Sequence, residues 1–448
     1  MNDPRTRVLR LGALARVEGE AALHLRVQDG SVTETRLRIY EPPRFFEAFL
    51  IGRGHTEPPD ITSRICGICP VAYQMSACQA IEKACGVTVD GPLSELRRLL
   101  YCGEWIESHA LHVYLLHAPD FLGRADVLGL ARDQRSAVER GLRIKQAGNA
   151  ILEQLGGRPV HPVNIRVGGF YRTPAPAELR PLAERLRQAR EDALETVRWV
   201  AAFEFPDAVC DHDLLALRDP GRYAIDSGTP AVMAAQKQGR ALREFPVSNF
   251  EEHVREGQVP HSTARTATLD GRRFLTGPLA RYAISGRWLH PAAAEAARDA
   301  GLGDPADGAV CDNPFRSIVV RAVEVVQAVE EALRIIDGYE PPPRPAVQVP
   351  PREAVGAGAT EAPRGLLYHR YALAEDGTLT AARIIPPTAQ NQTAVEEDVR
   401  RAVQARLDRE GPAADDEELT RLCERAVRNH DPCISCAAHF LELTLDRT

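Results

Sequence analysis

The stretch RICGICP, residues 64–70, carries two cysteines, Cys66 and Cys69, at the spacing of a metal clamp. Gly67 between them allows a tight turn, and Pro70 suits the first position of a helix. Thiols at a helix N-terminus have a lowered pKa because the helix dipole favours the anion, and the thiolate is the form that binds metals. Two thiolates are half of a four-ligand site, so a second pair should exist elsewhere in the chain.

A second pair of cysteines lies near the other end of the chain, in DPCISCAAH, residues 431–439. Asp431 is a good helix N-cap and Pro432 a good first helical residue, so a helix is expected to begin there. Its first turns would carry three potential ligands at steps of three residues: Cys433, Cys436 and His439. Both cysteine pairs therefore offer thiolates at a helix entrance.

The distance between the pairs leaves the identity of the site open. Paired CxxC motifs of zinc ribbons usually lie about 15–20 residues apart, whereas these pairs lie at opposite ends of a 448-residue chain. Spacing alone is compatible with a structural zinc, with a redox or other soft-metal site, and with no shared site at all. Four soft thiolates also suit nickel or iron, and a thiolate can bridge two metals.

The composition excludes several classes of protein. Hydrophobic residues make up 44% and charged residues 26% of the chain, which is ordinary for a globular protein with a sizeable core. Acids and bases are interspersed at a net charge of −7, so nothing points to nucleic acid. No apolar run approaches the roughly 18–20 residues that span a bilayer. The start has no leader pattern, so a cytoplasmic protein is expected unless a signal-bearing partner carries it. Ten cysteines are too sparse for a disulfide scaffold.

Periodicity predicts a mainly helical α+β protein with small antiparallel pieces. One hairpin is expected over residues 20–40, turning at Asp29, and another around Asp376. Residues 206–312 are rich in turn residues and stay unassigned, and residues 341–365 predict a proline- and glycine-rich connector without a period. Helices are expected over residues 71–85, 93–117, 129–156, 174–202, 315–337, 394–410 and 415–429.

The two cysteine motifs, RxCGxC near the N-terminus and DPCxxCxxH near the C-terminus, together resemble the nickel–iron hydrogenase large subunit. The resemblance covers essentially the whole chain, and residues 57–82 are similar to the cytoplasmic, NAD(P)-linked branch of sulfhydrogenase alpha subunits. Further stretches match that family in the same order: ARVEGE (15–20), FFEAFLIGR (45–53), SHALHVYLLHAPDF (108–121), GGRPVHP (156–162), EAPRG (361–365) and PPTAQN (386–391).

This resemblance implies a single large-subunit domain over residues 1–448, mainly helical, with a central helical bundle and small antiparallel sheets. Its expected segments follow one another along the chain: an N-terminal hairpin with the first metal motif (1–92), a helical core (93–205), an irregular region (206–312), a helix, connector and second metal motif (313–439), and a candidate maturation tail (440–448).

The resemblance also implies the metal ligands. All four motif cysteines would bind nickel. Cys66 and Cys433 would be terminal ligands, whereas Cys69 and Cys436 would bridge to an iron that carries carbonyl and cyanide. The other cysteines match no ligand motif and are interpreted as buried small hydrophobes: Cys78, Cys85, Cys102, Cys210, Cys311 and Cys423. The histidines of the helix over residues 93–117 are interpreted as packing residues rather than ligands: His109, His112 and His117.

Two carboxylates gain roles from the same resemblance. Glu18 matches the family's proton relay beside a cysteine ligand. Glu47, together with His439, matches the ligands of a second site for magnesium or a similar cation, and a carboxylate suits such a hard cation. Each glutamate also has a plainer interpretation, because an isolated glutamate is most often solvated.

Five further residues match the surroundings of the metals. Arg364 would lie above them, where a guanidinium can polarise hydrogen or stabilise charge. Pro363 and Thr388 would line the pocket of the diatomic ligands, with Thr388 as a hydrogen-bond donor to cyanide. Asp120 and Asp431 would be acidic residues of the same canopy. Taken alone, Arg364 is a loop charge, Asp120 a helix-end residue and Asp431 an N-cap.

Two features depart from the family's pattern. Many relatives have a histidine four residues after the second cysteine, where this chain has Tyr73, so no role of that histidine is carried over. The family's large subunit is normally cleaved by a maturation protease after its final histidine, whereas this chain continues with FLELTLDRT, residues 440–448. We expect the tail to be removed, so that the mature chain ends at His439.

The function implied by the resemblance is the catalytic subunit of a hydrogenase, which interconverts H2 with protons and electrons. The metals would act as Lewis acids that make bound H2 more acidic, and a base would take the proton. The chain has no further CxxC set for an iron–sulfur relay and no GxGxxG nucleotide fingerprint. An iron–sulfur small subunit is therefore implied, with flavin and NAD(P) on diaphorase-type subunits of a hetero-oligomer. The rivals are a non-catalytic relative as in respiratory complex I, which would lose the cysteines, and a structural zinc protein.

Overall fold

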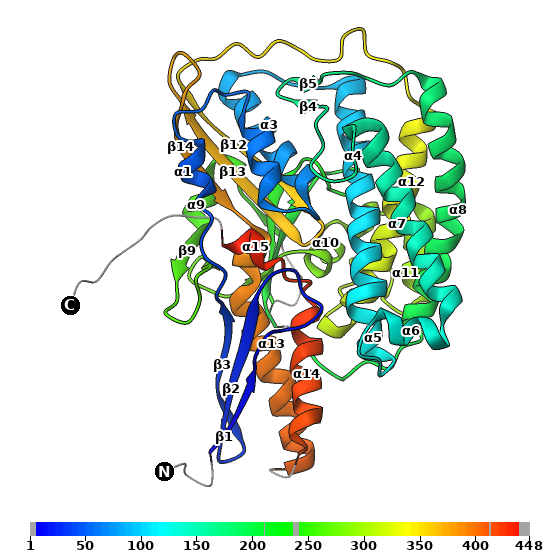
Figure 1. Cartoon of the computed structure of the whole chain (residues 1–448), viewed down its shortest axis with the longest axis vertical. Coiled ribbons are helices and arrows are strands. Elements are labelled where there is room, and N and C mark those ends of the chain that lie inside the picture. Colours follow the sequence, from blue (N-terminus) through cyan, green and yellow to red (C-terminus); the bar gives the residue numbers. More distant parts are fainter. Residues whose placement is uncertain (1–5, 210, 236–241, 412–413, 439–448) are drawn as a thin grey trace, which may run out of the picture.

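The computed structural model describes residues 6–209, 211–235, 242–411 and 414–438. Helices α4 and α12 are buried along most of their length, and their buried residues include charged side chains as well as apolar ones. The mainly helical α+β architecture predicted from the sequence is confirmed. Long helices stand side by side along one flank of the molecule (Figure 1): α4 (Gly91–Leu111), α7 (Arg135–Gly156), α8 (Pro176–Ala201) and α12 (Ser317–Asp337).

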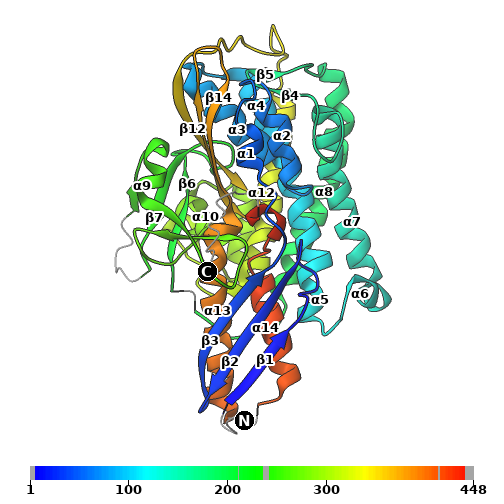
Figure 2. The same ribbon diagram turned by 60° about the vertical axis from the view of Figure 1, so that its left-hand side comes forward.

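The predicted N-terminal hairpin is confirmed and gains a further strand. β2 (Ala21–Gln28) pairs with β3 (Ser31–Ile39), and β1 (Thr6–Leu11) pairs with the other edge of β2. β2 buries alternate residues, and the apolar face of this sheet packs with α13 (Pro387–Glu410) and α14 (Asp416–Arg428) in one core (Figure 2). Both helices were predicted, although α13 begins earlier than the expected residue 394.

A second antiparallel sheet lies against α3 (Pro70–Cys85), a helix that ends at Gly86 as predicted. The hairpin expected around Asp376 is confirmed as β13 (Gly365–Leu373) and β14 (Leu379–Ile385). The connector expected over residues 341–365 is wrong in its second half, because Ala354–Ala362 forms β12 and pairs with β13. Its glycines and alanines reflect close packing rather than flexibility, since a Cβ at Gly358 would lie 2.6 Å from the carbonyl oxygen of Ser76 in α3.

The stretch 206–312, left unassigned from the sequence, contains short strands and helices. β11, β6, β7 and β8 form one sheet in that order, with β11 parallel to β6, and β9 pairs with β10. Short strands between irregular loops give too little periodicity to be predicted. The elements are β6 (Asp213–Arg218), β7 (Thr229–Met233), β8 (Leu242–Glu244), α9 (Phe250–His253), β9 (Val254–Gln258), β10 (Arg265–Leu269), β11 (Phe274–Leu275), α10 (Pro278–Ser285) and α11 (Pro291–Asp299).

Two helix predictions need correction. The helix expected over residues 129–156 is interrupted at Gln134, where φ of −132° and ψ of 50° separate α6 (Val127–Asp133) from α7. The helix expected over residues 93–117 changes to a π-helix at His112–His117. The remaining short elements connect the larger ones: α1 (Phe46–Leu50), α2 (Pro58–Thr62), α5 (Ala118–Phe121), β4 (Ile165–Arg166) and β5 (Gly169–Phe170).

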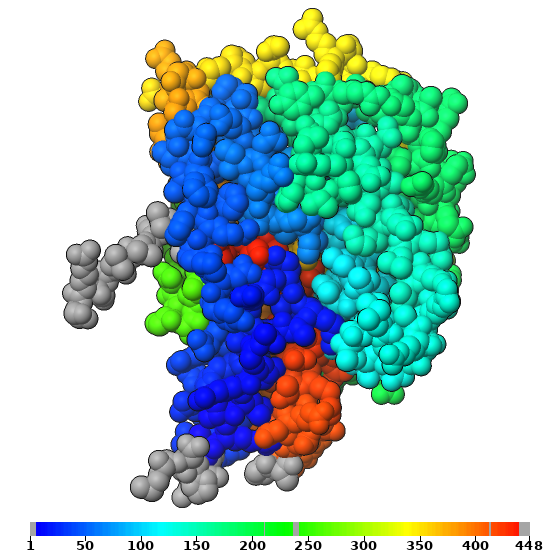
Figure 3. Space-filling view, in the orientation of Figure 1, coloured from blue at the N-terminus to red at the C-terminus, as the bar shows by residue number. Residues whose placement is uncertain are grey.

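The last described helix, α15 (Ile434–Ala437), lies in the middle of the molecule, between the bundle and the two antiparallel sheets (Figure 1). In the space-filling view it is visible between N-terminal segments, which close around it (Figure 3). The start of α3 reaches the same point, so the two cysteine motifs meet there. Among the described residues, every helix is too short or too polar to cross a membrane.

Candidate metal centre

The four motif cysteines converge, although 367 residues of chain separate the two motifs. Their Sγ atoms all lie within 4.8 Å of one another. The Sγ of Cys66 is 3.5 Å from that of Cys433, and the Sγ of Cys69 is 3.8 Å from that of Cys436. Each of the four residues is at most 3% exposed. The predicted shared site therefore exists as a buried cluster of sulfurs.

The first pair lies at the start of a long helix, as predicted. Cys69 is the N-cap residue of α3 and Pro70 is its first residue. The backbone N–H groups of Ile68 and Cys69 donate to the Sγ of Cys66 at 3.3 and 3.4 Å, so the turn bends around that sulfur. These N–H donors favour the thiolate form of Cys66.

Glu104 of α4 holds the same helix entrance in place. Its carboxylate accepts hydrogen bonds from the N–H of Val71 at 2.6 Å and of Ala72 at 3.2 Å, both unpaired by the helix itself. The side chain is fully buried, and burial raises the pKa of Glu104 well above its ordinary value. Sequence reasoning missed this residue, because Glu104 belongs to no motif and is one of several charged residues in α4.

The second pair lies at a much shorter helix, which Cys433 precedes and which contains Cys436, and here one prediction is wrong. The helix begins at Ile434 with Cys433 as its N-cap, not at Asp431. Asp431 instead has a left-handed backbone, with φ of 50°, and its carboxylate pairs with Arg364 at 3.1 Å. A buried guanidinium binds a carboxylate more strongly than a helix N-terminus does, so the ion pair overrides the capping preference.

Contacts from distant segments hold the second pair. The carbonyl oxygen of Glu18 accepts the N–H of Ile434 at 2.9 Å. Thr388, in the first turn of α13, accepts the N–H of Cys433 on Oγ1 at 3.1 Å. Because that hydroxyl accepts from the backbone, its own proton stays available to a further acceptor, which suits the predicted donor role.

Arg44 links the two cysteine motifs directly. Its Nη2 donates to the carbonyl oxygen of Ile65, beside the first pair, at 2.7 Å and to that of Ser435, between the second pair. Its backbone N–H donates to the carbonyl oxygen of Ala438 at 2.9 Å. Sequence reasoning missed Arg44 as well, because an arginine in a loop is usually solvated.

The structure brings Glu18 to the cluster. Its Oε2 lies 3.0 Å from the Sγ of Cys433 and accepts the N–H of Ser435 at 3.1 Å. The residue is only half-buried. The carboxylate therefore spans the short distance between a buried sulfur and the partly exposed edge of the protein.

The structure also brings Arg364, Pro363 and Thr388 to the cluster, and all three are buried. Arg364 lies in the tight turn between β12 and β13. Its Nε donates to the carbonyl oxygen of Asp431 at 2.8 Å, whereas its buried Nη1 makes no hydrogen bond within the part of the chain that the structure describes. Burial lowers the pKa of Arg364, but Asp431 and the cluster sulfurs, led by Cys433, raise it well above its ordinary value.

Asp120 lies in a separate group of charges. Its carboxylate pairs with Arg428 at 2.6 and 2.9 Å and also with Arg16. Among the described residues, Asp120 has no ion pair with Arg364. These ion pairs fix the carboxylate of Asp120, and its place in the canopy stays a prediction.

Glu47 accepts the N–H of Ile384 on Oε1 at 2.8 Å, and its Oε2 lies 4.0 Å from Nη1 of Arg383. Its predicted partner in a cation site, His439, lies outside the described residues, as do the tail and Cys210. Glu47 is nevertheless only partly exposed, which contradicts the plainer interpretation as a fully solvated carboxylate.

The packing interpretation of the other cysteines and histidines agrees with the structure. The other described cysteines are buried: Cys78, Cys85, Cys102, Cys311 and Cys423. The three helix histidines are also buried, and burial lowers the pKa of each. Tyr73, which replaces the family's histidine, is buried too, and burial raises its pKa, so its phenol stays neutral.

Electrostatics distinguish the four thiols from one another. Hydrogen bonds from neighbouring thiols, first from Cys433, lower the pKa of Cys66 well below its ordinary value. Burial raises the pKa of Cys433 and of Cys436. Binding a metal would displace the remaining protons, because thiolates are the coordinating form. A set of four converging sulfurs with a buried guanidinium beside it fits a soft metal centre such as nickel with iron.

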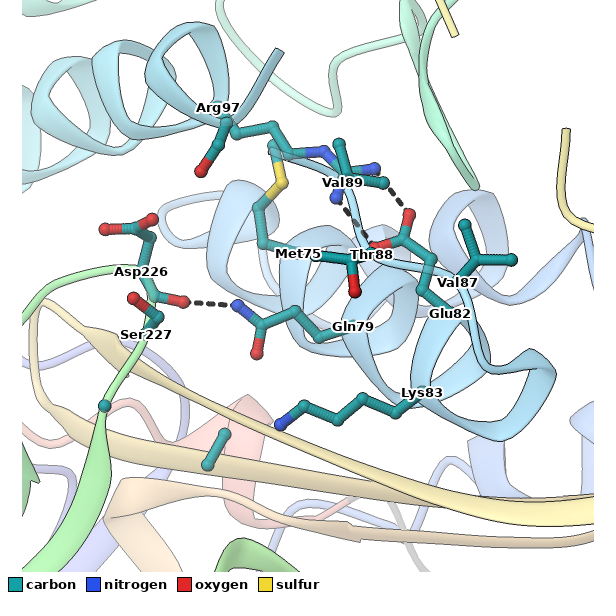
Figure 4. A pocket seen from close by; sticks show the side chains of 13 residues that line it. Met75, Gln79, Glu82, Lys83, Val87, Thr88, Val89, Arg97, Asp226 and Ser227 are labelled. Atoms are coloured by element: carbon teal, nitrogen blue, oxygen red, sulfur yellow. Dashed lines mark hydrogen bonds and ion pairs between the residues drawn. The ribbon is translucent and has the colours of Figure 1, made fainter. Parts of the chain in front are cut away.

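A cavity of about 300 Å³ lies away from this cluster (Figure 4). It is bounded by α3, the start of α4 and the loop before β7. Within it, Glu82 and Arg97 form an ion pair, and the side chain of Gln79 donates to the carbonyl oxygen of Asp226. None of the four motif cysteines lines it. The cavity is therefore not part of the site that the four cysteines form.

Known proteins are similar to this chain along most of its length. The family model described as nickel-dependent hydrogenase matches residues 44–141 and 317–439, which hold both cysteine motifs. Sulfhydrogenase 1 subunit alpha of Pyrococcus furiosus is 33% identical, over 96% of this chain and 97% of its own length. NAD-reducing hydrogenase HoxS subunit beta of Cupriavidus necator is 26% identical, over 97% of this chain and 95% of its own.

Solved structures agree with these sequence matches. A crystal structure of an NAD+-reducing [NiFe]-hydrogenase in the H2-reduced state has a TM-score of 0.86 at 28% identity, covering 97% of this chain and 99% of its own. The [NiFeSe]-hydrogenase of Dm. baculatum, at 21% identity and a TM-score of 0.77 over 97% of this chain and 100% of its own, shares the fold. This chain therefore belongs to the nickel-dependent hydrogenase family, as a nickel–iron hydrogenase large subunit and an oxidoreductase that acts on H2.

Proposed function

We propose that the four cysteines hold a nickel–iron centre, with carbonyl and cyanide on the iron, and that the chain catalyses the reversible conversion of H2 to two protons and two electrons. The observation that carries this proposal is the convergence of four buried Sγ atoms within 4.8 Å. Cys66 and Cys433 would be terminal ligands, and Cys69 and Cys436 would bridge. The bound centre supplies the Lewis acidity that makes H2 acidic and accepts the electrons.

Glu18 carries the proton in this proposal. A proton held on the Sγ of Cys433 moves to Oε2 of Glu18, which lies 3.0 Å away. The N–H of Ser435 orients the same oxygen. Because Glu18 is half-buried, its carboxylate can pass the proton on to solvent without a second buried relay.

Arg364, Asp431, Pro363 and Thr388 shape the space beside the sulfurs. Asp431 fixes two of the three guanidinium nitrogens of Arg364, which leaves Nη1 as a directed donor into a water-poor site. A preorganised donor of this kind stabilises charge that develops during reaction. The hydroxyl of Thr388 would donate to a cyanide, and Pro363 would exclude water. Asp120, which pairs with Arg16 and Arg428, would be a further acidic residue of the same canopy.

Metal analysis and infrared spectroscopy of the matured protein test the centre. We expect about one nickel and one iron per chain, with carbonyl and cyanide bands. Zinc alone, without such bands, would refute the proposal and would support the structural-zinc rival.

Exchanging Glu18 for glutamine tests the proton step. Glu18→Gln should keep both metals but lose H2 oxidation and H/D exchange, because an amide cannot carry the proton. Glu20→Gln, at an exposed glutamate two residues away, is the matched control and should behave as the wild type. Wild-type exchange in Glu18→Gln would show that the proton leaves by another route.

Electrons must leave through a partner. We propose an iron–sulfur small subunit, with diaphorase-type subunits that carry flavin and NAD(P), in a cytoplasmic complex. The support is the likeness to NAD-reducing hydrogenase HoxS subunit beta and to an NAD+-reducing [NiFe]-hydrogenase. Purification of the native complex should yield a hetero-oligomer that reduces NAD(P) with H2. An active single chain would contradict this.

The tail, residues 440–448, completes the proposal. A maturation protease would remove it, so that His439 can turn inward and join Glu47 in holding a magnesium-type cation. The carboxylate of Glu47 supports the second point, because it is partly buried and suits a hard cation. Intact-mass measurement of active protein should show a chain that ends at His439. A fully active chain that still ends at Thr448 would contradict cleavage.

A further inference from the structure

We propose that Arg281 is a positioning residue for Arg364, and that it acts by fixing the backbone of the turn between β12 and β13. This inference rests on the proposed role of Arg364. Arg281 lies on α10, contacts none of the four motif cysteines among its described hydrogen bonds and ion pairs, and has no exposed surface. The contacts of Arg281 that lead toward Arg364 are those to the turn.

Arg281 donates hydrogen bonds to the two backbone carbonyl groups that immediately precede Arg364. Its Nη1 donates to the carbonyl oxygen of Ala362 at 3.0 Å, and its Nη2 donates to that of Pro363 at 2.9 Å. One planar guanidinium thus spans two consecutive peptide groups. Because these groups lead directly into Arg364, the path of the backbone at Arg364 follows the position of Arg281.

Arg281 is itself held rigidly. Its Nε and Nη2 donate to the two carboxylate oxygens of Glu324, each at 2.7 Å, and its Nη1 donates to Glu361 at 3.1 Å. The guanidinium carbon lies 4.4 Å from the ring centre of Trp105, whose Nε1 donates to the carbonyl oxygen of Glu361 at 2.9 Å. With every nitrogen bonded and the ring alongside, the guanidinium has little freedom to move.

A second contact from the same helix supports the turn independently. Gly277, the N-cap of α10, has φ of 113°, and a Cβ at this position would lie 2.7 Å from the carbonyl oxygen of Arg364. Only glycine leaves room for this approach and adopts this backbone conformation without strain. Helix α10 therefore fixes the turn twice, through the side chain of Arg281 and through the backbone of Gly277.

A positional role explains why so many charges are buried here. A buried ion pair contributes little net stability, because its desolvation offsets the attraction, and apolar residues of similar size can replace it. A guanidinium fixed between two carboxylates, however, can hold two carbonyl groups to a defined position, which an apolar side chain cannot do. Loss of these hydrogen bonds would let Nη1 of Arg364 move away from the sulfurs. A displacement of a reacting group by about 1 Å can lower the rate roughly 100-fold.

Two variants of the matured complex test the inference: Arg281→Lys and Gly277→Ala. Lysine keeps the charge beside Glu324 but cannot reach both carbonyl groups and both carboxylates. Gly277→Ala keeps Arg281, and its added Cβ displaces the turn at the carbonyl oxygen of Arg364. It therefore remains informative if Arg281→Lys fails to fold. We expect wild-type nickel and iron content, a largely unchanged KM for H2, and kcat and H/D exchange lowered about 10- to 100-fold.

Arg97→Lys is the matched control. Arg97 is also buried and paired with one glutamate, Glu82, at 2.7 and 2.9 Å, but its described hydrogen bonds and ion pairs do not reach the turn. It should lose thermal stability as Arg281→Lys does, while turnover per nickel stays at the wild-type value. A loss of turnover in Arg97→Lys as large as in Arg281→Lys would show a general effect of core damage and overturn the inference.

Combining Arg281→Lys with Arg364→Lys separates the inference from the role of Arg364. If Arg281 acts through Arg364, the double variant is no slower than Arg364→Lys alone, and the cyanide bands of both single variants shift in the same direction. Losses that multiply would overturn the inference. If Arg364→Lys turns over slowly but Arg281→Lys has wild-type turnover, the inference about Arg281 is overturned and the role of Arg364 stands. Wild-type turnover in Arg364→Lys would contradict both the role of Arg364 and the inference about Arg281.

Discussion

The two cysteine pairs reach one centre from supports of very different kinds. Cys66 and Cys69 precede the 16-residue helix α3, whose first N–H groups are bound by a buried carboxylate. Cys433 is the N-cap of a four-residue helix that contains Cys436, close to the end of the described chain. The first pair is fixed by this long helix and by Glu104 of α4, whereas the second lies at a single helical turn and depends on contacts from Glu18, Thr388 and Arg44.

This difference indicates an order of assembly. A long helix with a satisfied N-terminus can present its thiolates before the rest of the site is complete. A single helical turn is not stable by itself and gains its shape from the segments packed around it. We therefore interpret the Cys66–Cys69 side as the preformed half of the centre and the Cys433–Cys436 side as the closing half.

Removing a sulfur from either half should have the largest effect. Cys69→Ser and Cys433→Ser are both expected to lose nickel and turnover to background, because a serine hydroxyl is a poor ligand for a soft metal. Metal content and H2 uptake measure this. Cys78→Ser, at a buried cysteine inside α3, should keep its nickel. Nickel retained in Cys433→Ser would show that the closing half does not share the centre.

Loss of a contact in the preformed half should lower the free energy of unfolding more than loss of a contact in the closing half. Glu104→Ala leaves the N–H groups of Val71 and Ala72 buried without a partner, and we expect a loss of about 2–4 kcal/mol in the free energy of unfolding. Chemical denaturation before metal loading measures it. Glu104→Gln keeps an acceptor, and because burial already raises the pKa of Glu104, this neutral variant should lose much less. Equal losses in both variants would contradict the assigned hydrogen bonds.

Removing Arg44, which links the two halves, should have an intermediate effect on nickel retention. Arg44→Ala removes two side-chain hydrogen bonds, one to each half, and is expected to cost about 2 kcal/mol. Because the loss falls on closure, nickel should dissociate faster while the unloaded chain stays folded, as followed by nickel release to a chelator. Arg53→Ala, at an exposed arginine of the same segment, is the control. Unchanged nickel release in Arg44→Ala would remove Arg44 from the closing step.

The smallest effect is expected from one hydrogen bond in the closing half. Thr388→Val keeps the shape but loses the acceptor for the N–H of Cys433, which should cost about 1 kcal/mol. Thr393→Val on the same helix removes a hydroxyl that makes no hydrogen bond within the described residues, so it should be neutral. Thermal unfolding of the two valine variants compares them directly. If both unfold at the same temperature, Thr388 does not hold the closing half.

Local patterns predicted the parts of the fold that local forces decide. Pro70 and Gly86 mark the two ends of α3, and the alternation around Asp29 marks a hairpin, because capping and strand periodicity act over a few residues. Sequence patterns did not predict the secondary structure of segments whose conformation depends on packing. The residues of β12 are mostly small and show no period, and they form a strand because β13 pairs with them and α3 lies close above them.

For the site, the sequence by itself determined the ligand chemistry, since four cysteines in two short motifs define a soft donor set whatever the fold. Only the tertiary structure decided that sulfurs 367 residues apart meet within 4.8 Å. It also turned Asp431 from a helix cap into the partner of Arg364, and it gave Glu104 and Arg281 positions that no motif records. The physical reason is range: coordination chemistry is a property of side chains, whereas convergence and burial depend on every element that packs between them.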